Sequence, residues 1–383
     1  MNHITFARIR IVFLKMTVGA GVMACLLSSQ AASSGSHILN DESVVDQTRR
    51  SAPPKYQIID IGVVQRGDAS QGLRVSAGGV AVGRSLARTG SRAFTWKKGR
   101  KIAGLPNLKS RSFCVSNGAN DSGTVVGTCA TTASGESRLP VIWQKGRVSQ
   151  LKLPSGQTLG DATQVNISGI AVGSAGSGTS QRGVIYTADT GAPITKTGPN
   201  GSYFVTAIGI NDAGRVVGQG VDPTNASRSV GIVYDIGSGT PFEVGALPDA
   251  NGAVAFGVSN AGHVVGTSMM NQGPGKPFIW SQSREMVAIP LPSGTSSGSG
   301  KAANSAGWVV GDAGGQYSVP WLYDGTTTYR LADLIPANSG WDLSTNTSAS
   351  AEGISENNII IGTGVFKGLT HAYAMVPVSV AGA

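Results

Sequence analysis

Two cysteines are the side chains with the clearest chemistry in this 383-residue sequence. Cys114 lies six residues before the segment Asn120–Gly123 (NDSG), which is typical of a tight turn, and Cys129 lies six residues after it. Antiparallel strands leaving such a turn would place the two cysteines opposite each other. We therefore predict a Cys114–Cys129 disulfide if the chain is exported to an oxidising compartment. The alternative is two buried free thiols.

Histidines are too few to indicate a catalytic site. Beyond the first 31 residues they are His37, His263 and His371. We expect His263 at an exposed strand position and His371 at the start of a packed strand. Spacing does not exclude a Ser-His-Asp triad, which assembles in space, but no G-x-S-x-G elbow stands between a predicted strand and a helix. The sequence therefore predicts no catalytic, cofactor-binding or metal-binding residue.

Acidic residues also lack the arrangement of a glycosidase. Asp121 and Asp212 occupy the same turn position in two repeats, where turn chemistry alone accounts for them. Asp60 lies at a predicted strand end and is expected in solvent. Three further aspartates are the one alternative for a hard cation, as oxygen ligands: Asp222, Asp249 and Asp312.

The elements that must position these residues repeat along the chain. A short apolar segment ending in glycine recurs seven times, with its final glycines 44 to 51 residues apart. We number the repeats as units 1 to 7. The seven segments are Val80–Gly83, Val125–Gly127, Ala171–Gly173, Val216–Gly218, Val264–Gly266, Val309–Gly311 and Ile360–Gly362.

Each glycine segment has the same neighbours. A turn rich in Asn, Asp and Gly precedes it, which predicts a hairpin because these residues tolerate the left-handed conformation. Twelve to sixteen residues after the glycine, a further strand ends in a bulky residue that is expected to fill the core between sheets, with a ligand-stacking shelf as the alternative. These bulky residues are Trp96, Trp143, Tyr186, Tyr234, Trp280, Tyr323 and Met375.

A last short strand completes most units, so one unit of about 46 residues holds four antiparallel strands, the size of a propeller blade. The seventh unit stops at Pro377 without its fourth strand, and a strand of that type precedes unit 1 at Tyr56–Ile61. Pairing of the two would complete the last blade. We predict an all-β, seven-bladed β-propeller closed in this way, with a parallel β-helix as the alternative.

The units resemble those of a known family. Ser91–Trp96 (SRAFTW), Ile210–Gly218 (INDAGRVVG) and the triplet at His371–Tyr373 are similar to HAF-repeat proteins, a bacterial family described as extracellular repeat proteins. The last unit alone keeps the His of the triplet, and Tyr373 replaces its Phe. The resemblance spans Tyr56–Pro377 and implies an extracellular location and the fold, but no biochemical activity.

The N-terminal segment reads as an export signal. Residues 1–31 combine basic side chains with the apolar run Met16–Leu27 and small residues before position 32, typical of a cleaved signal peptide. The alternatives are a membrane anchor and a lipoprotein modified at Cys25. Residues 32–55 are predicted to be a disordered leader, 56–377 the propeller and 378–383 a short tail.

Charge and composition exclude several classes. Gly accounts for 55 of 383 residues without a strict three-residue period, which excludes collagen, and only 13% of residues are charged. The formal net charge of +9 falls to +6 once residues 1–31 are removed, because they hold three basic side chains and no acidic one. Such a modest charge disfavours nucleic-acid binding.

These observations predict an exported, non-enzymatic binding or surface-interaction module without a cofactor, located in the periplasm, on the cell surface or outside the cell. Loops rich in Ser, Thr and Asn would suit a glycan or another neutral polar surface, and an envelope protein is the other expected partner. The alternatives are a secreted polysaccharide lyase or hydrolase and a structural envelope protein.

Overall fold

The computed structural model describes residues 52–378, and within this range it contains strands and three short 3-10 turns but no α-helix. The predicted all-β class is confirmed. The predicted signal peptide, residues 32–51 of the leader and residues 379–383 of the tail lie outside the described residues. Over 52–378, no helix is long and apolar enough to cross a membrane.

Each unit begins with two strands joined by the predicted turn. The first strands, which we call the inner strands, are β2 (Ala69–Val75), β6 (Phe113–Ala119), β10 (Gly160–Val165), β14 (Tyr203–Ile210), β18 (Ala250–Val258), β22 (Ser297–Ala303) and β27 (Ser350–Ile354). The second strands, which carry the repeated glycine, are β3 (Ala81–Ala87), β7 (Val125–Ala130), β11 (Ala171–Ala175), β15 (Arg215–Asp222), β19 (Val264–Met270), β23 (Val309–Gly314) and β28 (Ile360–Phe366).

Two outer strands follow in most units. The third strands are β4 (Gly90–Trp96), β8 (Leu139–Gln144), β12 (Arg182–Tyr186), β16 (Asn225–Asp235), β20 (Lys276–Ser281), β24 (Ser318–Tyr323) and β29 (Leu369–Pro377). The fourth are β5 (Ala103–Gly104), β9 (Arg147–Gln150), β13 (Gly191–Pro193), β17 (Pro241–Glu243), β21 (Arg284–Ala288) and β25 (Thr328–Arg330). The remaining elements are β1 (Tyr56–Asp60), β26 (Trp341–Asp342), η1 (Gly178–Ser180), η2 (Pro199–Gly201) and η3 (Leu331–Leu334).

The described strands form six antiparallel sheets in chain order. Four sheets hold one unit each, and an eight-stranded sheet joins units 1 and 2 through one parallel bridge between Ser91 and Phe113. In the last sheet β1 pairs with β29, with Tyr56 opposite Pro377, so the N-terminal strand takes the fourth position of unit 7 as expected.

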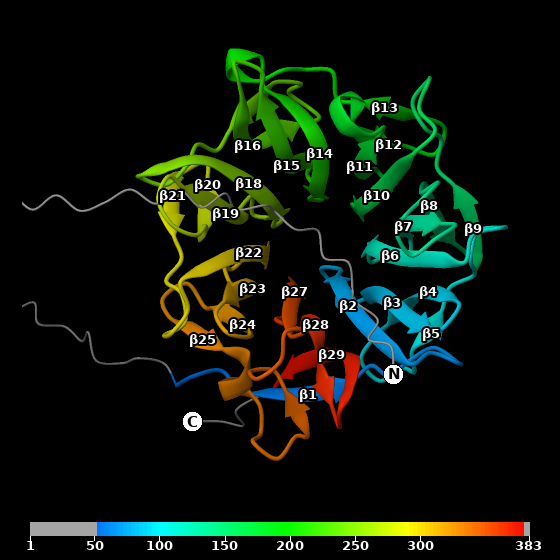
Figure 1. The fold of residues 1–383 in the computed structure, drawn as a ribbon, viewed down its shortest axis with the longest axis vertical. Coiled ribbons are helices and arrows are strands. Elements are labelled where there is room, and N and C mark those ends of the chain that lie inside the picture. Colours follow the sequence, from blue (N-terminus) through cyan, green and yellow to red (C-terminus); the bar gives the residue numbers. More distant parts are fainter. Residues whose placement is uncertain (1–51, 379–383) are drawn as a thin grey trace, which may run out of the picture. The chain divides into compact units, whose positions relative to one another are not determined.

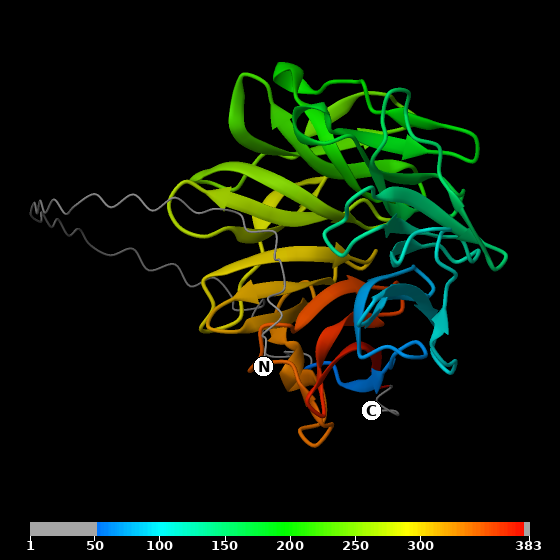
Figure 2. The same ribbon diagram turned by 45° about the vertical axis from the view of Figure 1, so that its right-hand side comes forward.

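The sheets follow one another around a common centre, with the inner strands nearest to it (Figure 1). Each inner strand packs on the second strand of the preceding unit, and β2 of unit 1 packs on β28 of unit 7. The view in Figure 2 shows the same order of sheets from another side. The inner strands therefore share one central space.

The hydrophobic core is divided among seven clusters, each built mainly from neighbouring units. One of them packs Val82 of unit 1 against Trp143 of unit 2. The predicted packing role of the bulky residues holds: Trp96, Trp143, Tyr186 and Met375 are buried. Tyr234, Trp280 and Tyr323 are half-buried and pack against the edges of clusters.

The repeated glycine is required by a β-bulge. In every unit the inner strand has one extra residue immediately after the residue that faces this glycine. A Cβ atom on the glycine would lie 1.9–2.0 Å from a carbonyl oxygen of the inner strand in all seven units. No other residue can occupy this position without moving the backbone.

The disulfide between Cys114 and Cys129 is present, and the two residues are direct partners across β6 and β7. Two deviations from the predicted simple hairpin cancel. The turn is one residue longer than expected, because Asn120 N–H bonds to the carbonyl of Thr124. The bulge at Asn117 then shifts the pairing back by one residue. The predicted pair is thus correct although the assumed register was not.

Candidate functional site

The turns between inner and second strands are held by one side chain each, at the first turn position. We call these seven residues the turn set. Each is at most 5% exposed, and each accepts a hydrogen bond from the backbone N–H four residues on, for example from Arg215 to Asn211 Oδ1 at 2.8 Å. The turn set consists of Ser76, Asn120, Asn166, Asn211, Ser259, Asn304 and Ser355.

The asparagines of the turn set have a second role that the sequence did not reveal. Asn120 Nδ2 donates to the carbonyl oxygen of Asn166 at 2.8 Å, and Asn211 Nδ2 donates to that of Ser259 at 3.0 Å. Asn166 and Asn304 make the same bond to the next unit at 3.4 Å. Among the hydrogen bonds within residues 52–378, no serine of the turn set donates to the corresponding carbonyl oxygen of the next turn.

Where serine occupies the turn-set position, other side chains take part in connecting the turn to the next unit. Asp121 accepts from Ser76 Oγ and from Gly78 N–H, so the aspartate we assigned to turn chemistry also joins units 1 and 2. His263 Nδ1 lies 3.3 Å from the carbonyl oxygen of Asn304. The expectation that His263 is exposed was wrong: it is half-buried between units because it serves this contact. Every pair of consecutive turns is therefore connected.

The extra residues of the seven bulges form a second set, which we call the bulge set. All seven are half-buried, and no two are of the same type. Five of them line a cavity of about 420 Å3 at the centre, which lies within the usual size range of ligand pockets. The bulge set consists of Leu73, Asn117, Thr163, Ile208, Phe256, Lys301 and Glu352.

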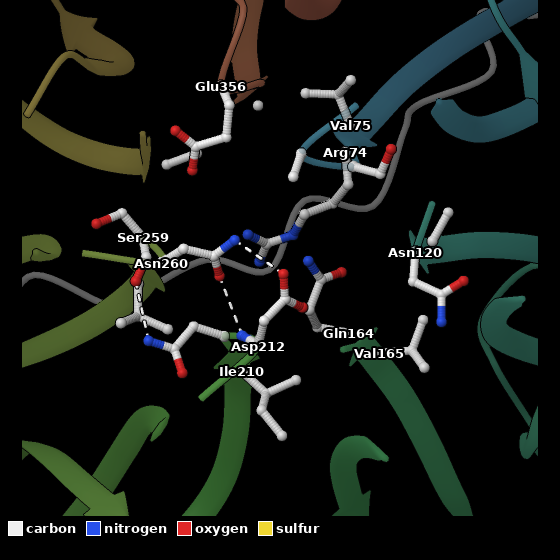
Figure 3. A pocket seen from close by; sticks show the side chains of 18 of the residues that line it. Arg74, Val75, Asn120, Gln164, Val165, Ile210, Asp212, Ser259, Asn260 and Glu356 are labelled. Carbon is white, nitrogen blue, oxygen red and sulfur yellow. Dashed lines mark hydrogen bonds between the residues drawn. The ribbon is translucent and has the colours of Figure 1, made fainter. Parts of the chain in front are cut away.

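Arg74, directly after the bulge of unit 1, lines this cavity and also a second one of about 90 Å3 beside the turn set. In Figure 3 its guanidinium extends into the middle of the smaller pocket, toward Asp212 and Asn260. Burial lowers the pKa of Arg74, and the carboxylate of Glu352 opposes that shift. The side chain therefore places a poorly solvated cation between the two cavities.

Acidic and neutral polar groups both surround this cation. Asp121, Asp212 and Glu356 line the smaller pocket, and each accepts a hydrogen bond from another group. Gln164 Oε1 is buried without a hydrogen-bond partner among residues 52–378, and it lines the smaller pocket. Gln181, on the wall of the larger cavity, uses its amide nitrogen on Thr206 Oγ1. Such amides can both donate to and accept from the hydroxyl groups of a bound molecule.

Charged groups gather on the side of the centre formed by units 5 to 7. Lys301 Nζ lies 5.1 Å from the ring centre of Phe256. Asp312 accepts a hydrogen bond from Ala351 N–H at 2.8 Å. Burial, followed by the charge of Glu352, raises the pKa of Asp312 to about 8, although Lys301 and the hydrogen bond from Ala351 oppose the shift. One carboxyl group in this half is therefore protonated at neutral pH.

The three aspartates considered for a hard cation do not come together. Asp222 is paired with Arg228 at 2.9 Å and accepts from Thr224, whereas Asp312 faces unit 7. Within residues 52–378, no three His, Cys, Asp or Glu side chains form a group that could hold a metal ion. The cation alternative is therefore wrong for Asp222, Asp249 and Asp312.

His371 lies in a packed strand as expected, although β29 begins two residues earlier at Leu369. The expectation that Asp60 is in solvent was wrong. His371 Nδ1 lies 2.9 Å from Asp60 Oδ1, which also accepts from Gly62 N–H. The two residues belong to β29 and β1, so this contact fastens the N-terminal strand to unit 7. A strand-end position in the sequence could not reveal a partner 311 residues away.

No family model matches the chain. No curated protein sequence matches it either. Among solved structures, the chain is similar to that of YCF48 bound to D1 peptide, with a TM-score of 0.51, 12% identity and coverage of 87% of this chain and 98% of that one.

Two further structures are similar. The β-propeller domain of the Trilobed protease from Pyrococcus furiosus, described as having an open velcro topology, gives a TM-score of 0.50 at 9% identity, over 81% of this chain and 94% of that one. A streptogramin B lyase gives 0.46 at 12% identity, over 84% and 98%. At such identities the first two likenesses show the fold alone, a β-propeller.

Proposed function

We propose that this chain is a non-enzymatic binding module whose ligand sits in the central cavity and is recognised by the bulge set. One observation carries the proposal. A structural position that occurs once in every unit holds seven different side chains, whereas the turn set holds only Asn and Ser. A scaffold that needed only stability would repeat its best side chain, so the variation at the bulge set marks the surface that contacts something other than the protein.

Two apolar members of the bulge set support this reading. Leu73 and Ile208 are half-buried, line the larger cavity and belong to none of the seven hydrophobic clusters formed by the described residues. Apolar side chains left beside a cavity are available to a ligand.

A glycan is the ligand class that fits best. The cavity wall combines amide and hydroxyl groups, including Asn117, Thr163 and Gln181, with the apolar side chains of Leu73 and Ile208. Amides and hydroxyls match the hydroxyl groups of a sugar, and apolar side chains match the C–H faces of its ring. The same mixture is a poor match for a strongly hydrophobic ligand.

The wider setting is part of the same proposal. We propose a seven-bladed propeller of the HAF-repeat type, closed by β1, that is exported after cleavage of residues 1–31. The pairing of β1 with β29 and the Cys114–Cys129 disulfide support it, because disulfides persist in oxidising compartments.

A thermal-shift screen of the full chain against envelope glycans tests the proposal. Ligands that bind the native state raise the melting temperature with concentration. We expect such a rise with at least one glycan, its loss in Leu73→Ser, and its retention in the matched control Leu369→Ser, whose side chain is 55% exposed on β29. No rise with any glycan would contradict the proposal.

An enzyme that cleaves polysaccharides is the second candidate, and one observation favours it. Asp312, with its raised pKa, and Glu352 lie together beside Lys301, and a protonated acid next to a carboxylate is an arrangement that acid–base catalysis uses. Release of reducing ends from envelope polysaccharides, abolished in Asp312→Asn, would support this function in place of the first.

A structural envelope role has less support. The exposed large apolar side chains among residues 52–378 are Ile167, Tyr317, Leu369 and Val378. They lie on separate loops and strand ends of units 3, 6 and 7, so no single element gathers them into a docking patch.

A further inference from the structure

We propose that Arg74 is an anion-binding residue and that the ligand carries a carboxylate, as an acidic sugar does. This inference rests on the proposed function and narrows it from glycans in general to acidic ones.

Arg74 departs from its own repeat. The residue directly after the bulge is small in five of the other six units, and only unit 3 has another long side chain there, Gln164. The small residues at this position are Gly118, Gly209, Gly257, Ala302 and Gly353. In unit 1 a long cationic side chain therefore enters a space that most units leave to the backbone.

Arg74 also differs from the other half-buried arginines that have short contacts. Arg138 pairs with Asp161 at 2.7 Å, Arg215 pairs with Asp235 at 2.7 Å, and Arg228 pairs with two carboxylates. Arg74 has no ion pair within 4 Å among the described residues, and its one hydrogen bond is a 3.4 Å contact to the carbonyl oxygen of Phe256. Arg84 and Arg182 likewise have no ion pair there, but Arg84 Nε donates to Gln71 Oε1 at 2.7 Å and Arg182 donates to two backbone carbonyl oxygens at 2.8 Å.

An unpaired guanidinium in this position is costly for the free protein. Burial takes the charge out of water, and most of the five N–H donors of the guanidinium find no acceptor in the protein. A carboxylate would satisfy two of these donors at once, because its oxygens match the planar fork of the guanidinium. The two cavities that meet at Arg74 give a ligand access to it.

The surroundings favour one negative charge over two. Glu352 acts on Arg74, and the carboxylates of Asp121, Asp212 and Glu356 line the smaller pocket. A phosphate dianion would therefore meet repulsion that a monoanion meets less. Lys301 is already directed at the ring of Phe256 and acts on Asp312. Gln164 Oε1, buried without a partner among the described residues, needs a donor. An acidic sugar supplies both a carboxylate and hydroxyl donors on neighbouring carbons.

The test compares galacturonic acid, a monoanion, with its methyl ester, in which the carboxylate is replaced by an uncharged ester. Calorimetric titration of the full wild-type chain should show binding of the acid and binding of the ester weakened about 30-fold or more. Arg74→Met should weaken binding of the acid by a similar factor and leave binding of the ester unchanged. The control Arg284→Met, at an exposed position of β21, should bind both as wild type does.

Unfolding adds a second readout that a structural role would not give. Because Arg74 has no ion pair, Arg74→Met should keep or raise the melting temperature of the free protein; a clear fall would overturn the proposal. Equal binding of acid and ester also overturns it. A protein that binds neutral glycans but not galacturonic acid contradicts this inference and leaves the proposed function standing, whereas no binding of any glycan removes both. Arg74-dependent binding of a peptide carboxylate in place of the sugar would overturn the acidic-sugar ligand.

Discussion

The turn set and the bulge set occupy neighbouring positions of the same hairpins, yet they follow opposite rules. Every member of the turn set is buried, uses its oxygen on its own turn and is Asn or Ser. The members of the bulge set are half-buried, and all seven differ. Asn117 and Asn120 are the same residue type three positions apart, yet the first lines the candidate ligand cavity and the second connects two turns.

The difference shows how a repeat protein can combine stability with recognition. The glycine of the second strand fixes the bulge, and the bulge turns one side chain per unit toward the centre. The asparagines of the turn set then connect their units to the next ones through hydrogen bonds, and Asp121 and His263 make the connection at the turn-set serines of units 1 and 5. The backbone plan is thus repeated, while the side chains at the bulge remain free to vary.

The largest effect should come from removing the glycine on which both sets depend. Gly266→Ala would place its Cβ 1.9 Å from the carbonyl oxygen of Val254, so we expect a loss of about 3 kcal/mol in the free energy of unfolding. The control Gly237→Ala meets no atom within 4 Å and should be nearly neutral. Urea unfolding measures both, and equal stabilities would break the account of the bulge.

Removal of the disulfide should have the next largest effect. Cys114 and Cys129 are already opposed by the hairpin, so the crosslink restrains a short loop, and Cys114→Ala/Cys129→Ala should lose about 2 kcal/mol. Thermal unfolding with and without reductant checks this: wild type should fall to the level of the double variant, which should not respond. Unchanged ligand affinity is expected, since neither cysteine lines the cavities.

The turn set can be divided into its two hydrogen bonds. Asn211→Ala loses both the bond from Arg215 N–H and the bond to the Ser259 carbonyl, at a cost of about 1.5 kcal/mol. Asn211→Ser keeps the first bond and loses the second, so about half of that loss is expected. If serine and alanine were equally destabilising, the connection between units would account for the whole effect and the bond within the turn for none.

The last prediction concerns the stability contribution of Asp312, which depends on pH and is absent from the comparison of variants at acidic pH. Its pKa is raised from the usual 3.8 to about 8, so the native state keeps a proton that the unfolded chain releases. Stability should therefore fall as the pH rises from about 4 to about 8. Asp312→Asn should match wild type near pH 4 and become the more stable protein near pH 8.5. Parallel pH profiles in urea unfolding would contradict the protonated state.

The sequence predicted the repeat, the hairpins, the pairing of β1 with β29 and the disulfide, because each depends on spacing along the chain or on its two ends. It did not predict the bulge, although the repeated glycine is its consequence. A glycine in the sequence indicates that a side chain is excluded, but it does not identify the carbonyl oxygen that excludes it. Contacts between units, such as Asp60 with His371 or Asn120 with Asn166, were not predicted from the sequence either. They depend on residues brought together only by the arrangement of the sheets.

The candidate site was missed for a related reason. The search for chemistry looked for clusters of His, Asp or Cys, whereas the central cavity is lined by unlike bulge-set residues from five of the seven units. Lys301 and Glu352 are 51 residues apart in sequence, yet both act on the carboxyl group of Asp312 because their inner strands are neighbours around one centre. Aligning the seven units on the glycine and asking which position varies most would have pointed to it.

The most direct test compares a variant altered only in the bulge set with a variant altered only in the turn set. Glycan affinity and melting temperature are measured for the wild-type full chain, for Leu73→Ser/Ile208→Ser in the bulge set and for Asn211→Ser in the turn set. The account predicts that the bulge variant loses affinity at an unchanged melting temperature, while the turn variant melts earlier and binds as wild type does. Loss of affinity in the turn variant, with normal binding in the bulge variant, would contradict it.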